Sequence, residues 1–289
     1  MRDSFDIHSN DNALFTTAMC SNRCLMCCQP PTTRNDIEKL WERNIYLIDT
    51  APKGLSSIGI TGGEPTLLGD RFFELIRYIR LTLPDTEIHV LSNGRAFSSM
   101  SFSQQLGEIG HEMILLGIPL HSDNQLDHDL IAGSVGAYTE TLQGLYNLAR
   151  WSFNIELRVV LTKLNYQRLP QLAHFIYRNL PFVKYISLMG LEYTGYTIKN
   201  ADQVWIEPVE MINQLSEATL FLASTGLNVS IFNLPLCVLP MNLWTYARKS
   251  ISDWKNCFSP FCDECKVKSE CCGLFATSRK QSSNLHPIL

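Results

Sequence analysis

Three cysteines, Cys20, Cys24 and Cys27, stand three and then two residues apart, directly after the apolar stretch Leu14–Met19. The prolines at 30 and 31 that follow favour a loop over a helix here. Three thiolates on one short loop make a soft-metal site, which suits an iron–sulfur cluster or zinc. Three ligands leave a four-iron cluster one ligand short, so one iron would stay open to a small molecule. An open coordination position is typical of a reacting metal.

Zinc is the main alternative to iron at this loop. It would need a fourth ligand nearby, and Cys28 adjoins Cys27 in the sequence, where its side chain tends to point away from its neighbour's site. A second alternative is that these cysteines are buried core residues, which free cysteines often are. Their regular spacing argues against that interpretation.

The spacing of the three cysteines resembles the cluster loop of the radical SAM superfamily, and the segment Thr61–Thr66 looks like that superfamily's Gly-Gly-Glu motif. The two glycines follow an apolar, strand-like run, and glycine lets the backbone approach a ligand closely. The resemblance implies that this loop receives the amino group of S-adenosylmethionine (SAM), with a carboxylate near the ammonium. The residues implied are Gly62, Gly63, Glu64 and Pro65.

Two further segments fit the same template less specifically. The β-rich run Glu87–Ser92 ends in Ser92 and Asn93, which resemble the segment that contacts the SAM ribose; the alternative is an ordinary Asn-Gly turn. Glu156 and Arg158 stand two residues apart and therefore share one face of a predicted strand. They could hold the carboxylate and hydroxyls of SAM, or they could form a surface ion pair.

The composition is that of a cytoplasmic enzyme. The chain has 289 residues, 45% of them hydrophobic, which is enough for one main domain and an appendage. A net charge of -4 argues against nucleic acid as a partner. The polar start Met1–Asn12 argues against a secretory signal, and apolar runs such as Met113–Leu120 are shorter than the roughly 20 residues of a membrane span. In a chain of this kind, ten cysteines indicate metal rather than disulfides.

Short β-rich runs alternate with helical patterns along the first two thirds of the chain. Strands are predicted at Leu14–Met19, Leu55–Ile60, Glu87–Leu91, Met113–Ile118, Ile155–Leu161 and Lys184–Met189. Helices are predicted at Asp36–Asp49, Arg71–Leu83, Ser101–Ile109, Tyr138–Trp151 and Leu169–Asn179. The alternation predicts α/β structure with parallel strands. It fits the partial (β/α)6 TIM barrel that the resemblance implies for residues 1–206, with the chemistry on loops after the strands.

Residues 207–289 change in character. A helix at Val209–Thr225 and a strand at Leu227–Phe232 precede a cysteine-rich tail in which Cys262, Cys265 and Cys271 stand two and five residues apart. By itself this motif could be a zinc knuckle. Its spacing is similar to the auxiliary-cluster segment of SPASM and twitch domains, the C-terminal extensions of radical SAM enzymes that mature peptides.

The resemblance implies one auxiliary [4Fe–4S] cluster rather than two. Full SPASM segments carry another cysteine four residues on, where this chain has Phe275. The best remaining fourth ligand is Cys237, which gives a predicted set of Cys237, Cys262, Cys265 and Cys271.

The other candidates are assigned no role. Cys28, Cys257 and Cys272 are interpreted as spare thiols, although the choice between Cys271 and Cys272 as ligand stays open. His121 is the one histidine placed to meet a substrate, but a structural role is favoured. The segment Arg279–Leu289 is predicted to be a loose tail.

Five segments narrow the resemblance to the smaller radical SAM maturase of the His-Xaa-Ser system: Cys24–Pro31, Leu188–Glu192, Asn233–Cys237, Ser250–Lys255 and Cys262–Cys271. The chain departs from that pattern at Cys28, where Ser is expected, and at Cys272, where Gly is expected; neither change removes a predicted ligand. The resemblance implies reductive cleavage of SAM to a 5′-deoxyadenosyl radical that takes hydrogen from a precursor peptide. The implied partners are that peptide, the second radical SAM maturase of the system, and an electron donor such as flavodoxin or ferredoxin. Alternatives are a radical SAM enzyme of small metabolites and a non-catalytic zinc or iron–sulfur scaffold.

Overall fold

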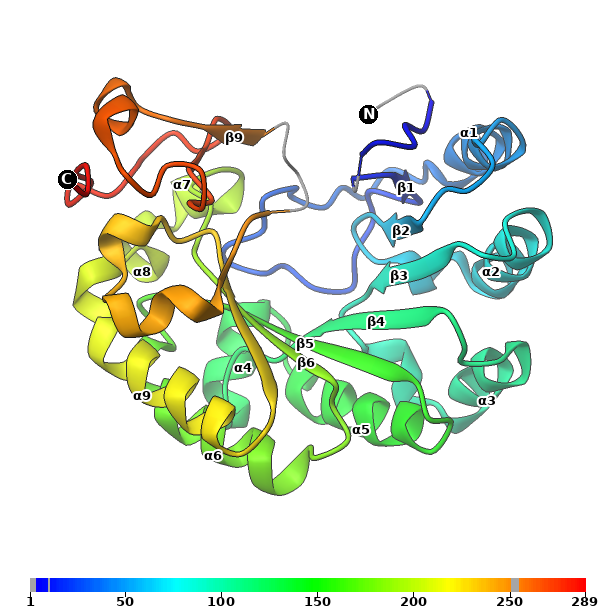
Figure 1. Cartoon of the computed structure of the whole chain (residues 1–289). Helices are drawn as coiled ribbons and strands as arrows, with labels where there is room; N and C mark the ends of the chain where they lie inside the picture. Colours follow the sequence, from blue (N-terminus) through cyan, green and yellow to red (C-terminus); the bar gives the residue numbers. More distant parts are fainter. Residues whose placement is uncertain (1–3, 10, 251–254) are drawn as a thin grey trace. The chain divides into compact units, whose positions relative to one another are not determined.

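The computed structural model describes residues 4–9, 11–250 and 255–289 (Figure 1). Part of the Ser250–Lys255 segment therefore lies outside the described residues. Eight strands pair in chain order: β1 Ala13–Phe15, β2 Ser57–Thr61, β3 Glu87–Leu91, β4 Ile114–Pro119, β5 Asn154–Val160, β6 Tyr185–Met189, β7 Asn228–Phe232 and β8 Ala247–Arg248. The pairings among β1 to β4 and among β6 to β8 are parallel. A short antiparallel pair, β9 Asn256–Cys257 and β10 Leu274–Phe275, lies in the cysteine-rich tail.

Helices follow most of the strands. They are α1 Ile37–Asp49, α2 Asp70–Thr82, α3 Met100–Ile109, α4 Gln125–Ala132, α5 Ala137–Ala149, α6 Leu169–Asn179, α7 Tyr196–Lys199, α8 Ala201–Val204 and α9 Ile212–Ser224. The predicted strand β3 and the predicted helix α6 are confirmed to the residue. Among the helices that the structure describes, none is long and apolar enough to cross a bilayer.

The chain divides into two compact units. Unit 1 comprises Met1–Arg23, Gln29–Pro119 and Ser134–Glu156; unit 2 comprises Cys24–Cys28, Leu120–Gly133 and Leu157–Leu289. The division at residue 206 that the sequence suggests stays a prediction. Strand β7, which lies beyond that position, pairs with β6 and extends its sheet.

Unit 1 has a core of aromatic rings behind its strands. The strands alternate buried and part-exposed residues, with Ile58 and Ile60 fully buried on β2. Phe73 and Phe102 lie with their ring centroids 4.6 Å apart, and Phe97 joins the same cluster. Burying a ring as fully as those of Phe73 and Phe97 stabilises the fold by about 1.5–3 kcal/mol. This packing fixes the helix side of the strands and leaves the loops at their carboxyl ends for chemistry.

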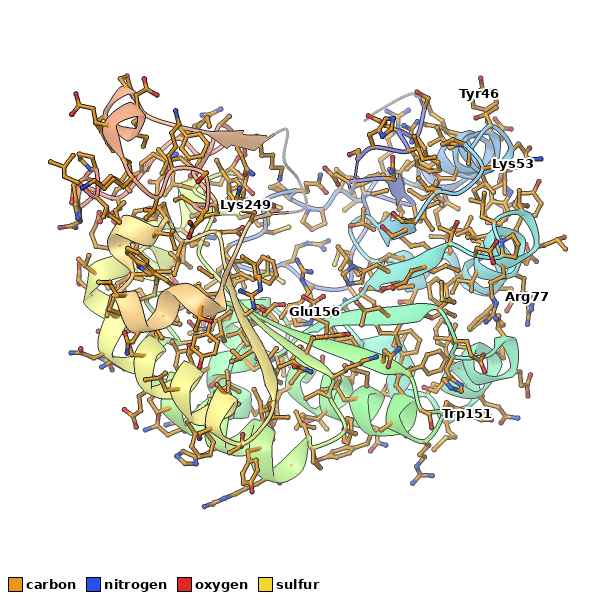
Figure 2. The ribbon with its side chains drawn as sticks, viewed as in Figure 1. Tyr46, Lys53, Arg77, Trp151, Glu156 and Lys249 are labelled. Atoms are coloured by element: carbon orange, nitrogen blue, oxygen red, sulfur yellow. The ribbon has the colours of Figure 1, made fainter. Side chains whose placement is uncertain are left out.

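The helix α3 of unit 1 is packed closely by Trp151 (Figure 2). A Cβ atom added to Gly107 would lie 2.2 Å from the Trp151 ring. Gly107 is therefore required by packing, because any side chain there would displace the indole.

Unit 2 is built on β6, β7 and the helix pair α6 and α9. The apolar face of α6 is buried through Leu172 and Ile176, and α9 buries Leu215 and Leu222. On the outer side of the pair, the ring centroids of His174 and Phe221 lie 3.9 Å apart. Pro170, at the first turn of α6, starts the helix without losing an internal hydrogen bond.

Candidate functional site

The Gly-Gly loop after β2 lies directly against the segment that leads to Cys20. The backbone N–H of Gly63 donates to the Thr17 carbonyl at 2.6 Å, and that of Glu64 donates to the Met19 carbonyl at 2.8 Å. A Cβ atom on Gly63 would lie 2.1 Å from the Met19 oxygen. The glycine is therefore required by packing between two loops of the chain, before any ligand is considered.

Glu64 is a buried carboxylate that ties two loops together. Its side chain accepts hydrogen bonds from the Thr66 backbone N–H (3.1 Å), the Thr66 hydroxyl (2.7 Å), the Ser92 hydroxyl (2.8 Å) and the Asn93 backbone N–H (2.7 Å). Burial raises the pKa of Glu64, and the donors oppose that shift. Three of these donors share Oε1 and the Asn93 N–H binds Oε2, so both carboxylate oxygens are engaged. The predicted contact between Glu64 and the SAM ammonium stays a prediction, and the structure shows a positioning role.

Ser92 and Asn93 follow β3 and are both buried. The Asn93 amide donates to the Ser21 hydroxyl at 2.8 Å, one residue after Cys20. Gly94 has a φ of 82°, so the turn that the sequence offered as an alternative is present as well. The two interpretations are compatible, because the turn aims Asn93 at the cysteine segment.

Cys20 has donors around its sulfur. The Asn22 backbone N–H lies 3.4 Å from the Cys20 Sγ, and the Asn93 side chain also hydrogen bonds to the thiol. Burial raises the pKa of Cys20, the Glu64 carboxylate raises it further, and the two donors oppose the shift. N–H groups directed at a sulfur suit a thiolate ligand of a metal cluster, so this position fits its predicted role.

Arg95 holds the cysteine segment from the side, and the sequence reasoning missed it. Its guanidinium donates to the Ser21 carbonyl at 3.0 Å, to the Asn22 side-chain oxygen at 2.7 Å and to the Ser134 hydroxyl at 2.8 Å, and it pairs with Glu140 at 2.6 Å. The signal available was its place two residues after Asn93. A planar fork of donors is well suited to several acceptors at once.

Cys24 and Cys27 belong to unit 2, where backbone bonds fix their loop. The Leu25 N–H donates to the Ile131 carbonyl at 2.9 Å, and the Tyr196 N–H donates to the Cys27 carbonyl at 2.9 Å. Gly195 has a φ of 55°, and a Cβ atom there would lie 2.3 Å from the Cys27 oxygen. Each of the predicted cysteine ligands lies outside a disulfide. Cys20 lies in unit 1, so the convergence of the three on one cluster stays a prediction.

The second predicted SAM-binding pair, Glu156 and Arg158, lies on β5. Glu156 (Figure 2) is buried and its carboxylate lies 3.0 Å from Nε2 of His89, on β3. Arg158 is half-buried, and its carbonyl accepts from the Leu120 N–H at 3.1 Å. A role for Glu156 and Arg158 in SAM binding stays a prediction.

His121, after β4, is buried within unit 2. Its backbone N–H donates to Nδ1 of His128 at 3.2 Å, and its carbonyl accepts from the Asn165 amide at 2.9 Å. Among the residues that the structure describes, its own Nδ1 has no hydrogen-bond partner. Burial, with a smaller contribution from His128, lowers the pKa of His121 well below its usual range. A neutral, buried ring agrees with the structural interpretation.

The tail cysteines lie in unit 2 with N–H groups at their sulfurs. Cys271 Sγ accepts from the backbone N–H of Leu236 and of Gly273, each at 3.4 Å. A hydrogen bond with the Cys272 thiol is the main factor that lowers the pKa of Cys271 to about 6, and the same bond raises the pKa of Cys272, which is buried. The Cys272 thiol also donates to the Gly273 carbonyl at 3.4 Å, and the choice between Cys271 and Cys272 as ligand stays a prediction.

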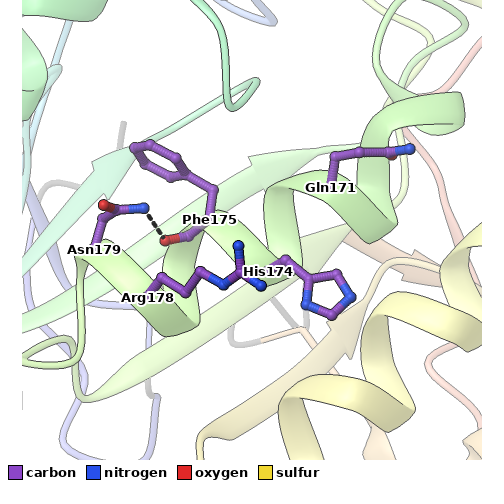
Figure 3. A pocket seen from close by; sticks show the side chains of 5 residues that line it. All are labelled: Gln171, His174, Phe175, Arg178 and Asn179. Atoms are coloured by element: carbon purple, nitrogen blue, oxygen red, sulfur yellow. Dashed lines mark hydrogen bonds between the residues drawn. The ribbon is translucent and has the colours of Figure 1, made fainter.

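Across residues 4–9, 11–250 and 255–289, no three His, Cys, Asp or Glu side chains are grouped closely enough to hold a metal ion. The fit of the two cysteine sets therefore rests on free thiols and on the donors around them. A surface hollow on α6 is unrelated to either set (Figure 3). It is lined by Gln171, His174, Phe175, Arg178 and Asn179, all from one helix.

Comparison with known proteins identifies the family to which the chain belongs. The family model of the radical SAM superfamily matches residues 14–176, more than half of the chain. Over 179 residues, the chain is 27% identical to the probable GTP 3′,8-cyclase of Sulfurisphaera tokodaii, which covers 61% of this chain and 54% of that protein.

Solved structures share the fold. SuiB of Streptococcus suis bound to S-adenosylmethionine matches with a TM-score of 0.59 at 18% identity, over 76% of this chain and 49% of that one. The anSMEcpe enzyme with bound AdoMet matches with a TM-score of 0.59 at 16% identity, over 76% of this chain and 62% of that one. The chain thus spans about half the length of several relatives that it matches, and at these identities the solved structures show the fold alone.

Proposed function

The chain belongs to the radical SAM superfamily, and from that premise we propose that it modifies a ribosomally made precursor peptide of the His-Xaa-Ser type. Members of the superfamily use a [4Fe–4S] cluster and SAM, and this chain is an enzyme of that class. When bound, these groups supply one electron and a 5′-deoxyadenosyl radical that abstracts a hydrogen atom from the substrate.

The residues of the chain hold and orient these groups. We assign Cys20, Cys24 and Cys27 as the ligands of the cluster, which leaves one iron open. The backbone of the Gly-Gly loop receives the amino acid end of SAM, and Asn93 lies beside it. Glu64 keeps those two loops in register through its bonds to Ser92 and Asn93. Preorganised loops of this kind hold the reactants close together, which is a large part of catalysis.

The peptide substrate is supported chiefly by the structural likeness to SuiB. One matching structure is SuiB bound to its precursor peptide SuiA, with a TM-score of 0.54. Another is anSMEcpe with a bound peptide. The five sequence segments that resemble the smaller maturase of the His-Xaa-Ser system point to the same substrate class.

The tail adds a second metal site to the proposal. We assign an auxiliary [4Fe–4S] cluster to Cys237, Cys262, Cys265 and Cys271, as in SPASM and twitch extensions. It would accept an electron back from the substrate radical or place the peptide. The proposed partners are the precursor peptide, the second maturase of the system and a flavodoxin or ferredoxin. A cytoplasmic location keeps the thiols reduced.

A small nucleotide is the alternative substrate, because one relative is a probable GTP 3′,8-cyclase. The two proposals are separated by anaerobic reconstitution with iron and sulfide, followed by reduction with dithionite and incubation with SAM and either a His-Xaa-Ser repeat peptide or GTP. We expect 5′-deoxyadenosine to accumulate and the mass of the peptide to change only when SAM is present. If the peptide is unchanged and GTP is consumed, the substrate is the nucleotide and not the peptide.

A further inference from the structure

The C-terminal end of the chain is fixed in place, against the expectation of a loose tail. The segment 279–289, here called the strap, is held at several points within unit 2. The Glu207 carboxylate accepts from the Ser282 hydroxyl at 2.7 Å and from the Ser283 N–H at 3.2 Å. Near the end of the strap, the Lys266 N–H donates to the Ile288 carbonyl at 2.9 Å. The strap therefore has a defined course rather than a free end.

The strap brings backbone donors to two of the tail cysteines. The Ile288 N–H lies 3.4 Å from Cys265 Sγ. Burial raises the pKa of Cys237, and the nearby backbone of His286 opposes that shift. Pro287, between them, has no N–H of its own, and its ring restricts the backbone to an extended course. Two donors, two residues apart, thus reach cysteines that stand 28 positions apart in the sequence.

The donors to Cys271 come from segments that themselves carry tail cysteines, which sets the strap apart. Cys271 receives the N–H groups of Leu236, next to Cys237, and of Gly273, next to Cys272. The strap, by contrast, follows the last tail cysteine and contains none. Its contacts with sulfur therefore come from a segment that carries no cysteine of its own.

The structure also places a positive charge near this group. Lys249, labelled in Figure 2, donates to the Ser269 carbonyl and acts electrostatically on Cys271. Hydrogen bonds and positive charge near cluster sulfurs favour the reduced, more negative form of an iron–sulfur cluster, and so raise its reduction potential.

We infer that the strap sets the reduction potential of the auxiliary cluster, through the N–H groups of His286 and Ile288. This rests on the tail cluster of the proposed function and adds to it a determinant outside the ligand set. His286 and Ile288 are positioning residues: the Ile288 N–H points at the Cys265 sulfur and the His286 backbone lies near the Cys237 thiol, so both stabilise the added electron when the cluster takes up one electron from an external reductant.

The test compares two substitutions at position 288. Both are made in the 289-residue chain with Cys20, Cys24 and Cys27 replaced by Ala, so that the tail holds the remaining cluster. Ile288→Pro removes the N–H donor, and Ile288→Ala removes the side chain but keeps the donor. After anaerobic reconstitution, the cluster is titrated with dithionite and followed by EPR. We expect the Pro variant to need a more negative potential, with the ratio of reduced to oxidised cluster about tenfold lower at a fixed potential, or roughly 59 mV for one electron. The Ala variant should match its parent.

Each outcome is decisive. Equal potentials in the Pro and Ala variants, with iron retained in both, would overturn the role of the strap and leave the cluster itself intact. A parent protein that retains no iron would instead overturn the proposed cluster. If Ile288→Pro loses its iron, the comparison moves to His286→Pro against His286→Ala. Loss of iron from both proline variants would mean that the strap retains the cluster rather than tuning it, and would also overturn the inference.

Discussion

The carboxylate of Glu64 accepts the backbone N–H of Asn93 at 2.7 Å, across 29 residues of sequence. This bond joins the loop after β2 to the loop after β3, the two loops assigned here to SAM. Because both carboxylate oxygens are engaged by donors of unit 1, the side chain acts as a strut between the loops. The effect of Glu64 on SAM is thus expected to be transmitted through the backbone of its neighbours.

Glu64→Gln should weaken SAM binding and also destabilise the fold. The amide replaces one accepting oxygen with a donor, so at least one buried N–H or O–H loses its partner, at a cost of about 1–3 kcal/mol. SAM affinity, measured by calorimetry on the reconstituted protein, should fall by roughly tenfold with iron content unchanged. The matched control is Glu74→Gln on α2, which is exposed and should change neither quantity. A variant with normal affinity and normal stability would show that the strut is dispensable.

Arg95→Lys should loosen the segment around Cys20. Lysine has a single nitrogen, so it cannot hold the Glu140 carboxylate as Nε does while also reaching Ser21, Asn22 and Ser134 as Nη1 does. Hydrogen exchange measured by mass spectrometry should become faster in the peptide that contains Cys20. Arg71→Lys serves as control, because Arg71 also pairs with a carboxylate at 2.7 Å but at an exposed site, where such pairs contribute little to stability. If hydrogen exchange in this peptide is equal in the two variants, Arg95 does not hold the segment around Cys20.

His121 should make stability depend on pH. Burial lowers its pKa in the folded state, so between the folded pKa and the unfolded value of about 6.5 the unfolded chain binds more protons. Its contribution to stability is therefore fully present above about pH 6.5 and is lost as the pH falls toward the folded pKa, by at most about 1.4 kcal/mol per pH unit. Urea midpoints between pH 7 and pH 5 should fall less steeply for His121→Leu than for the parent.

The control for that measurement is His174→Leu, since His174 is exposed on α6. It replaces the same residue type at a position outside the core. If His121→Leu has the same slope as the parent protein, a different group titrates in this range and the assignment to His121 is wrong.

The sequence predicted the elements better than the contacts between them. Hydrophobic periodicity places β3 and α6 correctly because their buried faces repeat regularly. Helix α4 was missed, since its eight residues leave Leu126 and Leu130 exposed and show little periodicity. The strand β8 was missed as well, because two residues carry no pattern.

In the candidate site too, local features were predicted and contacts between distant residues were not. Spacing along the chain marks the cysteines and the Gly-Gly-Glu loop, because their chemistry is local. The partners of Glu64 and of Arg95 come from other loops, so no spacing announces them. The strap was misjudged for a related reason: its polar composition resembles a free tail, while its order comes from single backbone bonds to Cys265 and Lys266.

Replacing Cys20, Cys24 and Cys27 with Ala should abolish reductive cleavage of SAM while the tail cluster remains. The three thiolates are the protein ligands assigned to the catalytic cluster, so no open iron can form without them. The production of 5′-deoxyadenosine under dithionite, followed by chromatography, measures the loss. Cys28→Ala is the control, because Cys28 is exposed and assigned no ligand role. If the triple variant produces as much 5′-deoxyadenosine as the parent, these three cysteines are not the ligands of the catalytic cluster.

Cys265→Ala should remove the tail cluster and spare the rest of the chain. No residue from 255 to 271 is buried, so metal binding and folding are expected to be coupled there. Iron content should fall by about one cluster, residues 237–272 should become protease-sensitive, and modification of the peptide should stop while SAM is still cleaved. Cys257→Ala is the matched control, since that thiol also lies in the tail but is assigned no metal. A Cys265→Ala enzyme that keeps its full iron content, or that still modifies the peptide at the normal rate, would show that the second cysteine motif is not an auxiliary-cluster site.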